Sequence, residues 1–449
     1  MKKILPILWI LILIGAGFIT YTLVIKEGAP DNPATQDPTS EDPTQEETAP
    51  PPKRTSETYS SLVTKGDELF EDELYEKALR KYQGALVSHP TSLEALYKIG
   101  QTYLKNNDPV RARGFFEKVR DNTNSVEINV LIGRTYLNER EIETAKEHFS
   151  KLSNKEPEVM FYRGILAILY KNNETGKSIF EDLAPKNKKA QLFVDAFNYF
   201  EANRDGKQPH IDTLLAKAMI DSEEYAASIP LLFTAINSQN DYRDAWTLLG
   251  YSYLKIGQNQ DAIDALLQAK TLDPERPEVL FFLGMAYAIE DRFEDSIYYL
   301  EKAKKAGFQP QIQLEQKLAD IYIIQEEYDK AVKTLDKVTK LNPSDLSIFE
   351  KAVQISIEKL EEPKKALYFA KKAVENHPEE ALSYDLRGWA LITQGEYDDA
   401  KADLVKALEM DPDLPQTYKH IGLLFAKQGQ PDIAQKYYLK ADITSPQSP

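Results

Sequence analysis

The chain has 449 residues, no cysteine and a formal net charge of −16 at pH 7. The absence of cysteine excludes disulfides, thiolate metal sites, cysteine nucleophiles and the acylated cysteine of a lipoprotein. An acidic surface repels phosphate backbones, so nucleic acid is not an expected partner.

The N-terminal segment is predicted to be a membrane anchor, residues 1–26. An uncharged apolar run begins at Ile4 and ends at Ile25, and a helix of that length spans the roughly 30 Å hydrocarbon layer of a lipid bilayer. Lys2 and Lys3 precede the run. The positive-inside rule therefore predicts a single-pass plasma-membrane protein with a cytoplasmic N-terminus and an extracytoplasmic remainder.

A cleaved secretory signal peptide is the alternative interpretation of this segment. Gly15, Ala16 and Gly17 offer small residues for cleavage, but the apolar run continues for eight residues beyond them. Because a peptidase site normally follows the end of the apolar core, we favour an uncleaved anchor.

Residues 27–58 are predicted to be a disordered linker. They hold seven prolines, eight acidic residues and almost nothing apolar. Such a segment cannot bury enough surface to offset its ordering entropy. Prolines and mutually repelling acids keep it extended, so it forms a spacer with a reach of up to ~100 Å.

A sequence repeat with a period near 34 residues fills the chain from residue 59 to the end. The clearest copy begins at Arg243 and contains Trp246, Leu249, Gly250, Tyr253, Ala262, Leu266, Ala269 and Pro274. One small position recurs as Gly66, Gly100, Gly133, Gly164, Ala216, Gly250, Gly284, Ala319, Gly388 and Gly422, with Gln354 at the same register. Twelve residues later stand Ala78, Ala112, Ala145, Gly176, Ser228, Ala262, Ser296, Ala331, Ala366, Ala400 and Ala434. We interpret each copy as two antiparallel helices that approach closely at these small residues and are stabilised by stacking on their neighbours.

This pattern resembles that of the tetratricopeptide repeat family. The resemblance implies an all-α, right-handed superhelical solenoid of about eleven helical hairpins. We expect four repeats over residues 59–188, an irregular helix and loop over residues 189–208, and seven repeats over residues 209–449. The irregular segment has one apolar face and then a loop that includes Gly206.

Catalytic and metal-binding patterns are not found in the sequence. The five histidines, His89, His148, His210, His377 and His420, have no ligand spacing. His89 and His377 each precede a proline at the end of a second helix, where they can cap exposed carbonyls. We therefore expect no enzyme activity, no cofactor, no metal and no small-molecule substrate.

The family resemblance implies that partner segments bind to first helices on the concave side of the solenoid. The positions that it implies include Phe161, Tyr251, Phe281, Met285 and Trp389, and we predict that they form an apolar and aromatic strip for a peptide or helix. The alternative is that they pack against the second helices. The clamp by which some family members bind carboxylates is missing, because Lys351 and Lys419 are followed by Ile355 and Leu423.

We therefore expect a non-catalytic scaffold or assembly factor, tethered to a membrane, that binds other proteins. The opening Met-Lys-Lys-Ile favours a bacterium, weakly. The same scaffold facing the cytoplasm, a regulatory subunit of a membrane-associated enzyme complex, and a purely structural spacer remain as alternatives.

Overall fold

The computed structural model describes residues 58–123, 125–203 and 208–444. These ranges contain twenty-three α-helices, one short 3₁₀ helix and no strand, which confirms the all-α expectation. No helix in them is long and apolar enough to cross a bilayer. The predicted anchor and nearly all of the predicted linker lie outside the described residues.

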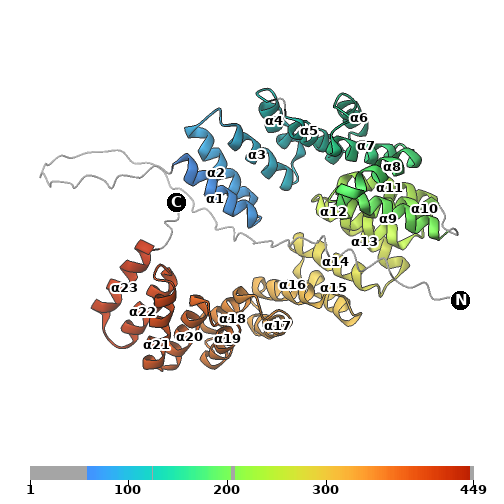
Figure 1. Cartoon of the computed structure of the whole chain (residues 1–449). Helices are drawn as coiled ribbons and strands as arrows, with labels where there is room; N and C mark the ends of the chain where they lie inside the picture. The colour runs from blue at the N-terminus through green and yellow to red at the C-terminus, as the bar shows by residue number, and fades with distance from the viewer. Residues whose placement is uncertain (1–57, 124, 204–207, 445–449) are drawn as a thin grey trace, which may run out of the picture. The chain divides into compact units, whose positions relative to one another are not determined.

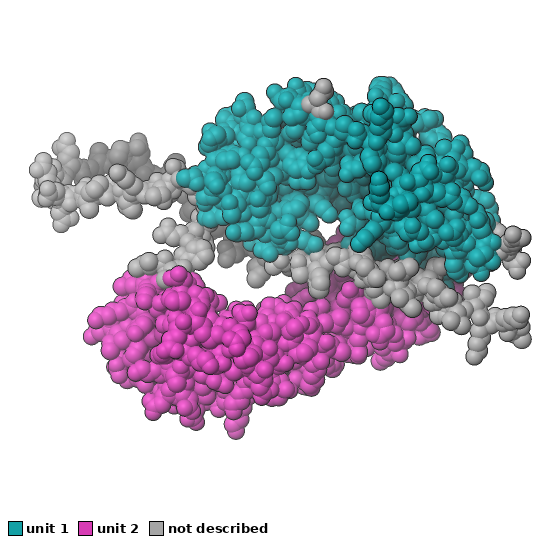
Figure 2. Space-filling model, in the orientation of Figure 1, with its two compact units in different colours: residues 1–258 teal, residues 259–449 magenta. Residues whose placement is uncertain are grey.

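The chain divides into two compact units, residues 1–258 and 259–449 (Figure 2). The helices of the first unit, labelled in Figure 1, are α1 (Tyr59–Glu71), α2 (Tyr75–Ser88), α3 (Leu93–Lys105), α4 (Pro109–Arg120), α5 (Val126–Asn138), α6 (Ile142–Ser150), α7 (Pro157–Leu169), α8 (Asn173–Leu183), η2 (Ala184–Lys186), α9 (Lys188–Ala202), α10 (Gln208–Asp221), α11 (Tyr225–Ser238) and α12 (Arg243–Lys255). Those of the second unit are α13 (Asn259–Leu272), α14 (Pro277–Ile289), α15 (Phe293–Lys305), α16 (Gln311–Ile324), α17 (Tyr328–Leu341), α18 (Leu346–Glu358), α19 (Pro363–Asn376), α20 (Ala381–Gln394), α21 (Tyr397–Met410), α22 (Pro415–Lys427) and α23 (Pro431–Thr444).

The turns between paired helices share one backbone feature. Each contains a residue in the left-handed conformation, such as Glu223 (φ 66°), Gly395 (φ 83°) and Gly429 (φ 74°). A left-handed residue just past a helix lets the chain reverse while the last carbonyls keep hydrogen-bond partners. The repeated turn therefore produces the repeated hairpin.

The small residues of the sequence repeat lie where two helices of a hairpin touch. A Cβ atom added at Gly100 would lie 2.6 Å from the Phe116 ring, and one added at Gly388 would lie 2.7 Å from Leu404 Cγ. Ala112 and Ala400, on the second helices, have no exposed surface. The predicted reason for the small residues, close approach of the two helices, is confirmed.

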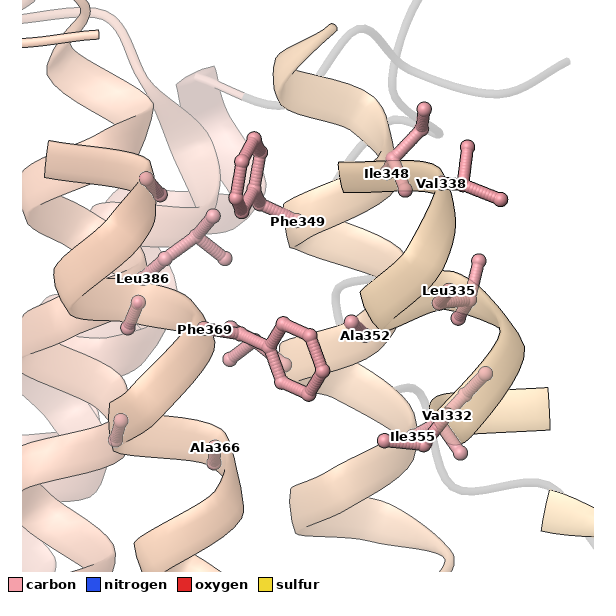
Figure 3. Packing of buried hydrophobic residues seen from close by; sticks show 14 of the residues in the cluster. Val332, Leu335, Val338, Ile348, Phe349, Ala352, Ile355, Ala366, Phe369 and Leu386 are labelled. Carbon is pink, nitrogen blue, oxygen red and sulfur yellow. The ribbon is translucent and has the colours of Figure 1, made fainter. Parts of the chain in front are cut away.

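The apolar core runs through successive hairpins rather than within one. Figure 3 shows Leu335 from α17, Phe349 from α18, Phe369 from α19 and Leu386 from α20 in one cluster. Each of these side chains is at most 3% exposed. Since burial of such a side chain contributes about 1.5–3 kcal/mol, each hairpin depends on its neighbours for stability.

One helix of the first unit has no hairpin partner. Helix α9 (Lys188–Ala202) packs between α8 and α10, and its Phe193 stacks on Phe180 of α8 with ring centroids 4.0 Å apart. This helix lies in the segment where the sequence predicts an interruption of the repeats.

The repeat register in α18 differs by one residue from the sequence-based prediction. Gln354, expected at the small buried position, is exposed, whereas Val353 has no exposed surface. The cause is an additional residue in the turn, since four residues separate α18 from α19 while three separate α14 from α15. The residue three positions before the buried one is therefore Glu350, whereas the sequence analysis placed Lys351 there, at the position of the clamp lysine.

Two glycine substitutions test the close helix contact, because they should change the free energy of unfolding in opposite directions. Gly388→Ala places a methyl group against Leu404 and 3.2 Å from the Ala400 carbonyl oxygen. We expect it to lower the free energy of unfolding by about 1–3 kcal/mol. Gly114→Ala, in α4, enters open space and should raise that free energy by about 0.5–1 kcal/mol. Chemical denaturation followed by circular dichroism measures both, and a stabilising Gly388→Ala would contradict the close contact.

Candidate protein-binding surface

Two of the five predicted binding residues lie in the core. Phe161 is 5% exposed and its ring contacts those of Tyr162, Phe180 and Phe193. Phe281 is also buried, and its ring stacks on Phe308 at 4.0 Å. In the described conformation both rings fill space between helices, as the packing alternative expects.

Tyr251 of α12 is partly exposed in the first unit. Its ring meets Tyr225 of α11 edge-on at 6.1 Å, and the ammonium group of Lys255 lies 5.9 Å from its centre. Burial raises the pKa of Tyr251 to about 12 and lowers the pKa of Lys255 below its usual value.

Trp389 and Met285, both in the second unit, are partly exposed. The Trp389 indole stacks on the His420 imidazole with ring centroids 4.6 Å apart and planes inclined by 16°. His420 Nδ1 lies 3.0 Å from both carboxylate oxygens of Asp385, which has no exposed surface. The indole therefore covers a buried carboxylate–imidazole pair that joins α20 to α22.

Glu350 lies on α18, which packs against α20, and we name Glu350, Asp385, Trp389 and His420 the Glu350 cluster. Burial raises the pKa of Glu350, the negative charge of Asp385 raises it further, and His420 opposes them. Among the described residues, the Glu350 carboxylate has no hydrogen-bond or ion-pair partner. A partly buried carboxylate without a partner is costly to keep ionised.

Only Trp389 of this cluster was singled out by the sequence analysis. Glu350 was missed because the additional turn residue shifted the register, and Asp385 and His420 were missed because they lie one repeat apart. A signal was nevertheless present: once the register is corrected, Glu350 and Asp385 occupy equivalent places in α18 and α20. Residues at equivalent repeat positions lie near each other in stacked hairpins.

The first unit covers part of its own first-helix surface. Helix α11 contacts α5 and α7 in addition to its hairpin partner α10. Most of its side chains are buried, including Ile229, Leu232 and Ile236. An apolar helix of the same chain therefore lies on the face of α5 and α7 where the family resemblance implies partner binding.

A buried polar triad fixes α11 in this place. Glu224, 1% exposed at the start of α11, pairs with Arg134 of α5 at 3.0 Å and accepts a hydrogen bond from the Tyr162 hydroxyl of α7 at 3.0 Å. The Glu224 charge raises the pKa of Arg134, and burial together with that charge raises the pKa of Tyr162. Lys189 donates to the Ser222 carbonyl and Arg134 to the Glu223 carbonyl.

The titratable groups of the described residues do not meet the requirements of a metal site. No group of three or more His, Asp or Glu side chains in residues 58–123, 125–203 and 208–444 is placed to hold a metal ion. His89 and His377 stand at the C-caps of α2 and α19, as predicted. His148 and His210 contact the Asn129 carbonyl and the Tyr242 hydroxyl.

Comparison with protein families settles the nature of the repeat. The family described as "Tetratricopeptide repeat" matches residues 63–126, 213–277, 247–310 and 316–345, and the description "TPR repeat" matches residues 388–429. The chain belongs to the tetratricopeptide repeat family. Tetratricopeptide repeat proteins generally mediate protein–protein interactions, and their scaffold is generally non-catalytic.

Individual relatives are distant. The human protein O-mannosyl-transferase TMTC1 is 26% identical over 172 residues, which are 37% of this chain and 19% of that protein. The BBSome complex member BBS4 homolog of Drosophila melanogaster is 26% identical over 224 residues, 49% of this chain and 42% of that protein. The chain thus spans less than half of either curated relative.

Solved structures that are similar to the chain have low sequence identity to it. A tetratricopeptide repeat protein from Parabacteroides merdae is 14% identical, with a TM-score of 0.35 over 54% of this chain and 95% of that one. The Cut9–Hcn1 hetero-tetramer is 13% identical, with a TM-score of 0.31 over 87% and 94%. These similarities concern the fold alone.

The polar triad can be tested by removing its positive charge. Arg134→Met leaves the buried Glu224 carboxylate without its counter-charge, so the free energy of unfolding should fall by about 3–5 kcal/mol. Arg111→Met, which removes an exposed arginine paired with Asp108, is the control and should leave the melting temperature nearly unchanged. Equal melting temperatures of the two variants would show that the triad does not fix α11.

Proposed function

We propose that this tetratricopeptide repeat protein is a non-catalytic scaffold or assembly factor that binds a partner segment on the α18–α20–α22 surface. The observation that carries the proposal is the partly exposed Trp389 indole, held against His420 above the buried Asp385. A rigid aromatic side chain in a partly buried setting is the typical centre of a protein interface. Its fixed orientation lowers the entropy lost when a partner binds.

We place the binding surface on the second unit because the corresponding surface of the first unit is already covered. There, α11 lies against α5 and α7 and the Glu224 triad fixes it. A partner segment would have to displace an apolar helix and expose a buried ion pair before it reached that face. The α18–α20–α22 surface needs no such displacement, because Trp389 and Glu350 are already partly exposed.

The membrane tether is the second part of the proposal. The apolar run from Ile4 to Ile25 is long enough to span a bilayer, and Lys2 and Lys3 favour a cytoplasmic N-terminus. The repeats would then stand outside the plasma membrane, at the end of the proline-rich linker. Protease treatment of intact cells and spheroplasts tests this orientation, because repeats facing the cytoplasm would be cut only after lysis.

Crosslinking in native membranes followed by mass spectrometry tests partner capture. The wild-type chain should enrich a defined set of proteins, and Trp389→Ala should lose at least about 80% of that set, as expected when a central aromatic anchor is removed. Tyr298→Ala, which removes an exposed aromatic ring of α15, is the matched control and should retain it. Both proteins should have the same helical content.

A second variant separates lost binding from lost folding. Gln354 is exposed and lies one helical turn from Glu350 on α18, so Gln354→Arg adds bulk to the surface without entering the core. Capture that survives both Trp389→Ala and Gln354→Arg would contradict binding at this surface. An enriched enzyme whose activity depends on the captured chain would favour the regulatory-subunit alternative.

A further inference from the structure

The Glu350 cluster has an excess of negative charge that the described chain does not neutralise. With both carboxylates ionised, Glu350 and Asp385 carry two negative charges, and the basic member of the cluster is the His420 imidazole, which pairs with Asp385. At least one negative charge therefore remains whichever protonation state His420 has. The nearby Lys351 ammonium group lies 3.4 Å from Asp320 on α16.

Glu350 is the member of the cluster that is open to an incoming group. Asp385 is fully buried and engaged by His420 through both oxygens. Glu350 is partly exposed, and its carboxylate has neither a hydrogen-bond nor an ion-pair partner among the described residues. Burial and the Asp385 charge destabilise the ionised form of the Glu350 carboxylate. A cation bound at this carboxylate would stabilise that ionised form.

The indole favours one kind of cation. Trp389 and Asp385 are four residues apart on α20 and so lie on the same helix face. A guanidinium group is planar, stacks on aromatic rings and donates two parallel hydrogen bonds to a carboxylate. An ammonium group is more strongly hydrated and gains less from the indole.

We propose that the α18–α20–α22 surface binds a partner segment through an arginine whose guanidinium group pairs with Glu350 beside the Trp389 indole. This inference rests on the proposed function, because it specifies the chemistry of the partner at the same surface. It also reverses the charge preference of the family's carboxylate clamp, whose lysines would bind an anionic end.

A peptide array provides the test, with the full chain purified in detergent. The central residue of each peptide is arginine, its neutral isostere citrulline, or glutamate, and the flanking positions vary over apolar residues. Arginine peptides should bind about tenfold more tightly than matched citrulline peptides, the size expected for one partly buried charge-assisted pair. Glutamate peptides should not bind.

Glu350→Gln should remove the preference for arginine over citrulline and leave the binding of citrulline peptides unchanged. The matched control is Glu375→Gln, the same change at an exposed position of α19, which should leave the preference intact. Because the pKa of Glu350 is raised in the folded chain, its stabilising contribution is present at low pH and lost as the pH rises through that pKa. Glu350→Gln should therefore not lower the melting temperature at pH 7.

The outcomes separate this inference from the proposed function. Equal binding of arginine and citrulline peptides that still requires Trp389 would overturn the arginine preference and leave the binding surface in place. An arginine preference that survives Glu350→Gln would overturn the role of Glu350. If no peptide of any central residue binds, both proposals fail.

Discussion

The contact between a glycine on the first helix of a hairpin and a bulky side chain sixteen residues later is the constraint on which this structure depends. It recurs from Gly66 with Tyr82 to Gly422 with Tyr438. A methyl group at those glycines would collide with the facing side chain, so the distance between the two helices is set in each hairpin that has such a glycine. The apolar side chains left on the outside of each hairpin are then buried by the next one, as the cluster around Phe349 and Phe369 shows (Figure 3).

Much of the fold could be predicted from the sequence because this contact leaves a periodic trace. Glycine or alanine recurs with a period near 34 residues, and that period identifies both the hairpins and the family. The register of α18 could not be predicted in the same way. One additional turn residue moves Val353 into the core and Gln354 to the surface, and the period alone does not show on which side of the turn the residue was added.

The candidate binding surface was less predictable, since it depends on side chains from different repeats. Phe161 and Phe281 are aromatic residues at first-helix positions where binding residues are expected, but neighbouring helices cover both rings. The packing of α11 against α5 and α7 joins residues about 90 positions apart, as Arg134 and Glu224 are, so no periodic pattern encodes it. Trp389 was predicted to be a binding residue because it is an aromatic residue of a first helix, while its setting beside Asp385 and His420 required the three-dimensional arrangement.

Glu224 in the first unit and Glu350 in the second differ in whether their carboxylates have partners within the described chain. Glu224 is buried with Arg134 and Tyr162, and its charge is satisfied within the chain. Glu350 is partly buried, and its burial together with the negative charge of Asp385 raises its pKa, which disfavours its ionised form in the free protein. A group that lowers the stability of the free protein and would be relieved by a ligand is typical of a binding surface.

Amide hydrogen exchange of the full chain, with and without a captured partner segment, tests this account most directly. The account predicts that the partner slows exchange in α18, α20 and α22 and leaves α5, α7 and α11 unchanged. Slower exchange in α5 and α7, accompanied by faster exchange in α11, would contradict it, because the partner would then have replaced α11 on the face that the first unit covers.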